Sequence, residues 1–237
     1  LYMIIASLAV VGLVASSFVG FFSGGGADYT EQDPIKVAIN NSKEVAAHLE
    51  NTLEEDPENA SASAELGNVY FQIGRLYLFD LEDEENGSQY FEKATETYKD
   101  ALELDPENNN MRVDMGTAAY FASKYDVAEE AFETAIEKDP EHPVAYFQYG
   151  VLLYFGQGEI DKAIENWETL LDLKDSYDKE KYPFVNEGIF TTAAGFVEDA
   201  RSLDFDFNND SDNDTNDDED NDNEDNNEDI ESDNEND

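Results

Sequence analysis

A repeat of 34 residues is the feature that most constrains how this sequence can fold. Pro106 and Pro140 are 34 residues apart, and so are Gly116 and Gly150. Gly67 and Gly116 are 49 residues apart, which equals one period plus an insertion of 15 residues. A fixed period of this length is typical of arrays of small helical units, because one helix pair buries its apolar face only against the next pair. The sequence therefore predicts three consecutive repeats.

Within the three stretches, the same residue types recur at the same positions. Each first half carries a large residue followed by glycine, and each second half carries a small residue, an aromatic residue and a small or apolar residue at spacings of four and three. In order, these positions are Leu66-Gly67, Met115-Gly116 and Tyr149-Gly150, then Ala94, Ala128 and Ala163, then Tyr98, Phe132 and Trp167, and last Ala101, Ala135 and Leu170. Residues at these spacings share one face of a helix, so we expect this face to be buried.

This pattern resembles the tetratricopeptide repeat, a helix-turn-helix unit of the same period. The resemblance implies an all-α solenoid in which Gly and Ala lie where helices cross closely, and it makes Trp167 a core residue. We expect the solenoid to span residues 35–203, with repeats at about 60–108, 109–142 and 143–176. Ile35–Glu54 is expected to be the second half of an incomplete leading repeat, and a helix at about 182–203 to cover the last repeat.

Two segments depart from the period. The insertion falls near Leu76–Gln89 and contains the acidic run DLEDEENGSQ, which is typical of a loop. The third repeat has one additional residue around Gly156–Glu159, which we expect to lie between its two helices.

The N-terminal segment, Leu1 to Phe22, carries no charged side chain. As a helix its 22 residues would span about 33 Å, enough for a bilayer core of about 30 Å. We therefore expect an uncleaved transmembrane anchor at 1–22, followed by a Gly-rich linker at 23–34. A cleaved signal peptide, with Gly25–Ala27 as its cleavage site, and a buried core helix are the alternatives. Because no base lies near the segment before Lys36, we expect a single-pass protein of the cytoplasmic membrane with its body outside.

Charge is distributed unevenly along the 237 residues. The chain has 13 Lys and Arg against 58 Asp and Glu, a net charge of −45, which argues against nucleic acid as a partner. Residues 204–237 hold 18 acids and no base, so we expect a disordered tail there. The tail could solvate the protein, bind calcium or magnesium weakly, or contact a basic partner. Even without it, residues 1–203 carry a net charge of −27.

No catalytic, metal-binding or cofactor motif is evident. The chain has no Cys, which excludes disulfides and thiol chemistry. His48 and His142 lack a metal-ligand spacing, and we expect both at the surface or at a helix edge. Gly24–Gly26 lack the Lys and Ser or Thr of a phosphate loop. We therefore expect a protein that is not an enzyme and holds no cofactor.

The resemblance also implies a binding surface, because the first helices of successive tetratricopeptide repeats line a concave groove. The corresponding residues are Asn68, Phe71 and Gln72 in the first repeat, Val113, Thr117, Tyr120 and Phe121 in the second, and Phe147, Val151, Tyr154 and Phe155 in the third. This surface is aromatic and nearly uncharged, so we expect it to bind a hydrophobic or helical segment of a partner protein. The alternative is that several of these side chains pack against the insertion or the closing helix.

These expectations combine into a non-catalytic, membrane-tethered scaffold or adaptor, expected to be bacterial, that holds a partner segment in the groove. Family members that bind a terminal carboxylate use basic residues there, but Ala64 and Val113 occupy those positions, so this mode is not expected. The alternative function is that of a cell-envelope structural or cation-binding protein acting through the acidic tail.

Overall fold

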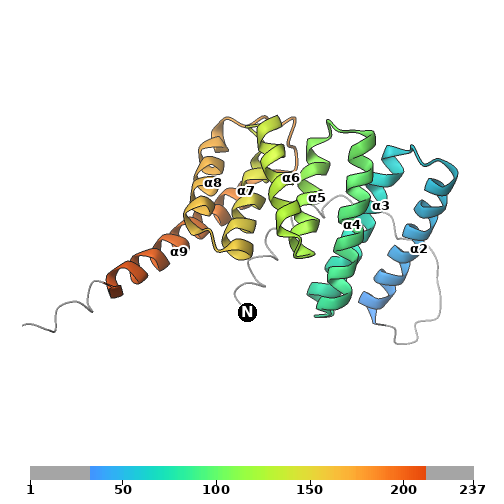
Figure 1. Cartoon of the computed structure of the whole chain (residues 1–237), viewed down its shortest axis with the longest axis horizontal. Coiled ribbons are helices and arrows are strands. Elements are labelled where there is room, and N and C mark those ends of the chain that lie inside the picture. The colour runs from blue at the N-terminus through green and yellow to red at the C-terminus, as the bar shows by residue number, and fades with distance from the viewer. Residues whose placement is uncertain (1–32, 212–237) are drawn as a thin grey trace, which may run out of the picture. The chain divides into compact units, whose positions relative to one another are not determined.

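The computed structural model describes residues 33–211 and builds them from helices, with no strand in that range (Figure 1). The α-helices are α2 (Pro34–Glu55), α3 (Ala60–Arg75), α4 (Glu84–Leu104), α5 (Asn109–Phe121), α6 (Tyr125–Lys138), α7 (Pro143–Val151), α8 (Ile160–Asp172) and α9 (Glu187–Ser211). Two π-helical turns, η2 (Leu76–Asp80) and η3 (Leu152–Gln157), extend α3 and α7, and a short 3₁₀ turn, η4 (Leu173–Asp175), follows α8. The chain divides into two units, residues 1–200 and 201–237, and the fold described below is that of the first.

The three predicted repeats are confirmed as the helix pairs α3/α4, α5/α6 and α7/α8, and each helix from α2 to α8 packs against the next. Glycine is needed in each first helix because an aromatic ring of the second helix lies directly against it. A Cβ added at Gly67, Gly116 or Gly150 would lie 2.7, 2.7 or 2.3 Å from Tyr98, Phe132 or Trp167, respectively. These three rings are buried, and Trp167 is a core residue as predicted.

The turns that join successive repeats share one sequence and one geometry. Residues 56–59 and 105–108 read Asp-Pro-Glu-Asn, and residues 139–142 read Asp-Pro-Glu-His. The last residue of each turn caps the next helix: Asn59, Asn108 and His142 accept hydrogen bonds from the backbone N–H three residues later, at 3.0, 3.2 and 3.2 Å. Such caps satisfy amides that have no partner within the helix. The turn therefore ends one repeat and starts the next.

The insertion in the first repeat is helical except for residues 81–83, so the predicted acidic loop is wrong for most of its length. The π-turn η2 continues α3, and α4 begins at Glu84, where the Asp83 side chain caps it by accepting from the Asn86 N–H at 3.1 Å. The additional residues lengthen both helices, and Figure 1 shows α4 reaching beyond its counterpart α6. Gly87 allows this extended pair to pack closely, since a Cβ there would lie 3.0 Å from Leu78. The acidic run contains no proline, so it is compatible with a helix.

The additional residue of the third repeat lies inside a helix and not between helices as predicted. It is absorbed by the π-turn η3, which fits one more residue into a turn than an α-helix does. The turn ends at Gly158, whose φ of +73° is in the left-handed region that glycine adopts without strain.

The leading helix α2 agrees with the prediction to one residue at each end. It buries Ile39, Ala46 and Leu49 against the first repeat. The side chains that face away from the repeat are polar, including Asn40, Glu44 and other exposed positions of this helix. A polar outer face is what the end of a helical stack needs, so α2 closes the stack on this side.

The closing helix α9 covers the third repeat as predicted, but both predicted ends are wrong. It begins at Glu187 because Pro183 disfavours helix at the preceding residue, and Asn186 Oδ1 accepts from the Gly188 N–H at 2.8 Å to start it. It continues to Ser211, through eight residues assigned to the tail, because residues 204–211 contain no proline or glycine. The side chains that pack with Trp167 are Ile189, Phe190, Ala193 and Val197. Phe184 falls inside the predicted helix range but precedes α9 and is 62% exposed.

The predicted anchor at 1–22, nearly all of the predicted linker and the remaining tail residues, 212–237, lie outside the described residues. Among residues 33–211, no helix combines the length and the apolar character that crossing a membrane requires.

Candidate functional site

Four of the predicted groove residues are buried. Val113, Thr117, Phe147 and Val151 are 2%, 7%, 1% and 4% exposed, and the Thr117 hydroxyl donates to the Val113 carbonyl at 2.9 Å. Phe147 and Val151 belong to the core around Trp167. These four side chains hold the repeats together and leave little surface for a partner.

The other predicted aromatic residues are half-buried and fall into two groups. The first group, at the junction of the first two repeats, contains Phe71, Phe79, Tyr120 and Phe121. Phe121 lies at its centre, with ring centroids 5.7 Å from Phe79 and 6.2 Å from Phe71, and it stacks at 4.9 Å on the buried Phe91. Sequence reasoning missed Phe79 because it belongs to the insertion, whose helical course was not predicted.

The second group, at the third repeat, contains Tyr154, Phe155 and Phe196. Tyr154 and Phe196 both lie against Trp167, with centroids 5.6 and 5.0 Å from its ring, and Phe155 packs edge-on against Phe196 at 5.6 Å. Phe196 comes from the closing helix α9. The alternative expectation, that groove aromatics pack against this helix, therefore holds for Phe155, which nevertheless keeps part of its surface exposed.

Tyr120 connects the two groups. Its ring lies 5.1 Å from Phe121 on one side, and on the other it borders Gly156, where an added Cβ would lie 3.4 Å from it. Gly156 belongs to η3, the turn that carries Tyr154 and Phe155. We call the seven side chains of the two groups the aromatic face. Its rings come from α3 and its extension η2, from α5, from the extension η3 of α7, and from α9.

Both tyrosines of the aromatic face are neutral at physiological pH. Burial raises the pKa of Tyr120 to about 12, with a smaller contribution from Tyr125. Burial also raises the pKa of Tyr154, and Asp199 adds to the effect. The face is therefore apolar with two hydroxyl groups, inside a protein of net charge −45.

Asn68 and Gln72, the two predicted groove residues with amide side chains, are exposed. Asn68 Oδ1 accepts a hydrogen bond from the Tyr98 hydroxyl at 2.7 Å, and Gln72 Oε1 accepts from Arg75 at 3.3 Å. Asn68 is thus held by the second helix of its own repeat.

His48 is exposed as predicted. His142 lies at a helix end, one of its two predicted positions, but it is buried and not at the surface. His142 is 2% exposed, and its Nε2 lies 3.0 Å from Asn110 Oδ1 while its Nδ1 caps α7. Burial is the main cause that lowers its pKa to about 4. The residue is therefore a neutral capping group, equivalent to the asparagines that begin the other two repeats.

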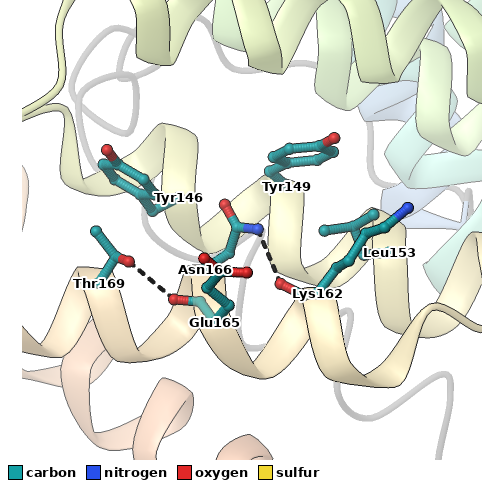
Figure 2. A pocket seen from close by; sticks show the side chains of 7 residues that line it. All are labelled: Tyr146, Tyr149, Leu153, Lys162, Glu165, Asn166 and Thr169. Atoms are coloured by element: carbon teal, nitrogen blue, oxygen red, sulfur yellow. Dashed lines mark hydrogen bonds between the residues drawn. The ribbon is translucent and has the colours of Figure 1, made fainter.

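Two shallow hollows lie elsewhere and contain none of the predicted site residues. Figure 2 shows the first, of about 350 Å³, lined by Tyr146, Tyr149 and Leu153 of α7 and η3 and by Lys162, Glu165, Asn166 and Thr169 of α8. Asn166 and Thr169 donate to backbone carbonyls of their own helix, at 2.9 and 2.8 Å. The second hollow, of about 700 Å³, lies over Tyr70 between α2 and α4. Within residues 33–211, no three His, Asp or Glu residues are grouped so as to hold a metal ion.

Comparisons with known proteins agree with this description. Residues 113–178 match the tetratricopeptide repeat family profile, and residues 30–122 match that of the plant-specific mitochondrial import receptor subunit TOM20. No curated protein matches.

Several solved structures are similar. One of MamA is 22% identical, with coverage of 73% of this chain and 88% of that one and a TM-score of 0.49. MamA from Desulfovibrio magneticus RS-1 is 18% identical, with coverage of 75% and 98% and a TM-score of 0.43. YrrB, a tetratricopeptide protein with an unusual peptide-binding site, is 20% identical, with coverage of 60% and 83% and a TM-score of 0.34. The profile match and the repeated helix pairs together identify tetratricopeptide repeats in this chain.

Proposed function

We propose that this protein is a non-catalytic scaffold that binds a segment of a partner protein on its aromatic face. The observation that carries the proposal is that seven aromatic side chains lie half-exposed in two groups, each held together by ring contacts, and that Tyr120 of the first group borders the turn η3 that carries Tyr154 and Phe155 of the second. Aromatic rings contribute a large share of the energy of protein interfaces, because they bury much apolar area at a small cost in conformational entropy. The presence of repeats that stack into extended binding surfaces supports the same conclusion.

The chemistry of the face favours a partner segment with apolar side chains. A helical or extended segment could place aliphatic or aromatic groups against Phe121 and Phe155 while its backbone meets the hydroxyls of Tyr120 and Tyr154. The buried residues behind the face, such as Phe147 and Trp167, would keep its rings in place. Binding would then require little rearrangement.

We also propose that residues 1–22 tether the protein to the cytoplasmic membrane, with its body outside the cell. This proposal rests on the length and apolar character of that segment. A reporter that is active only outside the cell, fused after Ser202, would be active under this topology. A silent reporter in an expressed fusion would refute it.

Two tyrosines of the third repeat allow a matched test of the binding face. Tyr154 belongs to the aromatic face, whereas Tyr146 is a half-buried tyrosine that lines the hollow in Figure 2. We expect Tyr154→Ala to reduce recovery of a co-purified partner at least about tenfold, and Tyr146→Ala to leave it within about twofold. Circular dichroism would establish that both variants fold. Equal recovery with both folded variants would refute the aromatic face as the binding surface.

A further inference from the structure

One carboxylate on α5, seven residues and thus about two helical turns before Phe121 of the aromatic face, has an unusual position. Asp114 lies on α5 close to Tyr98 of α4, and the Tyr98 hydroxyl donates to Asn68 on α3 at 2.7 Å. Asp114 and Asn68, an exposed residue predicted to bind a partner, thus both have Tyr98 as a neighbour where two successive repeats meet. The Asp114 side chain is half-buried.

Within residues 33–211, no basic side chain pairs with Asp114. The nearest base in sequence, Arg112, donates instead to the Pro106 carbonyl at 2.7 Å and to Asn109 Oδ1 at 3.1 Å. Lys124, at the start of α6, is held by Glu92 and Glu96 at 2.8 and 3.1 Å. Burial raises the pKa of Asp114 to about 7, with no hydrogen bond or positive charge opposing it. A half-buried acid without a partner disfavours the folded state.

Asp114 nevertheless keeps part of its surface exposed, because the residue is only half-buried. Asn68, which has the same neighbour Tyr98, is exposed. A basic side chain of a bound segment would approach Asp114 from this exposed side.

We propose that Asp114 forms an ion pair with a Lys or Arg side chain of the segment bound on the aromatic face. The proposal rests on the proposed function and specifies its partner as an apolar segment that contains a basic residue. The chain supplies no base of its own at this position, and its net charge of −45 attracts basic segments. A single carboxylate is too few ligands for a calcium or magnesium site, which leaves a basic side chain as the matching group.

The test is a selection of peptides of about 12 residues from a random library on the full chain, at about 0.3 M NaCl to suppress unspecific attraction. Four forms are compared: the natural sequence, Asp114→Asn, Tyr154→Ala and Asp172→Asn, the last being an exposed acid of α8 that controls for loss of one charge. We expect the natural sequence and Asp172→Asn to select peptides with Lys or Arg at a fixed distance from apolar residues. Asp114→Asn should lose this basic preference.

The affinity of the best selected peptide for each form of the protein then measures the contribution of the ion pair with Asp114. Replacing its basic residue with Gln should weaken binding roughly tenfold to the natural sequence and hardly at all to Asp114→Asn. Peptides without a fixed basic residue, or equal losses on both forms, would overturn the ion pair. If the selected peptides show no ion pair but still bind more weakly to Tyr154→Ala, the proposed function stands without the ion pair. If no selected peptide depends on Tyr154, the proposed function fails as well.

Discussion

At the scale of single residues, the glycines of the first helices mark the closest packing in the fold. Their pairing with Tyr98, Phe132 and Trp167 could be predicted from the sequence, because glycine and ring recur at one period. The structure adds the physical reason, which is that each ring occupies the space of the missing Cβ. Gly150 is the tightest of the three sites, and Trp167 Nε1 also donates there to the Phe147 carbonyl at 3.2 Å.

We expect Gly150→Ala to destabilise the protein by about 3 kcal/mol, because its Cβ would displace the buried indole. Gly195→Ala is the matched control: it lies in α9 with nothing within 4 Å of an added Cβ, and it should raise stability by about 0.5–1 kcal/mol. Urea denaturation followed by Trp167 fluorescence measures both. A loss of stability of less than about 1 kcal/mol for Gly150→Ala would contradict the close packing of Trp167 against Gly150.

The capping role of His142 could have been predicted from the sequence, whereas its burial could not. His142 follows Asp-Pro-Glu, as Asn59 and Asn108 do, and this shared position would have indicated a helix cap. Its burial could not be predicted from spacing, because Tyr182, whose ring lies 4.7 Å from it, comes from a distant loop.

This cap makes stability depend on pH. The pKa of His142 is about 4 in the folded protein and about 6.5 when unfolded, so the unfolded chain takes up the proton first as pH falls. The stabilisation is complete above pH 6.5 and is lost toward pH 4, by about 2–4 kcal/mol. His142→Asn keeps a capping side chain without titrating, so its urea midpoint should fall less between about pH 7 and about pH 4.5. An identical fall in both proteins would refute the assignment.

At the scale of helices, the insertion and the additional residue could be located from the period, but their structures could not. The insertion is taken up by the π-turn η2 and by the first turns of α4, and the additional residue is taken up by the π-turn η3. Acidic residues without proline suit either a loop or a helix, so packing against the neighbouring helix decides between them. For the same reason the sequence did not reveal that Phe79 joins the aromatic face.

The closing helix α9 should stabilise the third repeat selectively. Ile189→Ala removes a side chain that is 1% exposed in the core around Trp167, and we expect a loss of about 2–4 kcal/mol. Thr191→Ala, on the exposed side of the same helix, should change stability by less than about 0.5 kcal/mol. Hydrogen exchange should rise in α8 with Ile189→Ala while α3 and α4 stay protected. Uniform loss of protection would contradict this cap function.

At the scale of the whole molecule, repulsion between acids opposes folding. Residues 1–203 alone carry a net charge of −27, and the described ion pairs, such as that of Lys138 with Glu107 at 2.8 Å, are exposed and contribute little. We expect the melting temperature to rise by roughly 5 °C or more between about 0.05 and about 0.5 M NaCl, as salt screens this repulsion. A variant ending at Leu203 should keep most of the increase. A melting temperature that is constant or falls with salt would contradict this balance.

The repeat architecture followed from the sequence, whereas the binding face followed only in part. Position in the repeat identified Phe71, Tyr120, Phe121, Tyr154 and Phe155, which are half-exposed, but it could not separate them from Val113 or Phe147, which are buried in the core clusters. Phe196 was not assigned to the face because it lies outside the repeats.

Photo-crosslinking in intact cells tests the central claim most directly. A crosslinking amino acid replaces Tyr154 or Phe121 on the aromatic face, or Tyr146 in the hollow of Figure 2 as the control. If the aromatic face binds a partner, both face positions will give the same crosslinked protein, and position 146 will not. Crosslinks to that protein from position 146 alone, or none from either face position in a folded and expressed protein, would contradict the account.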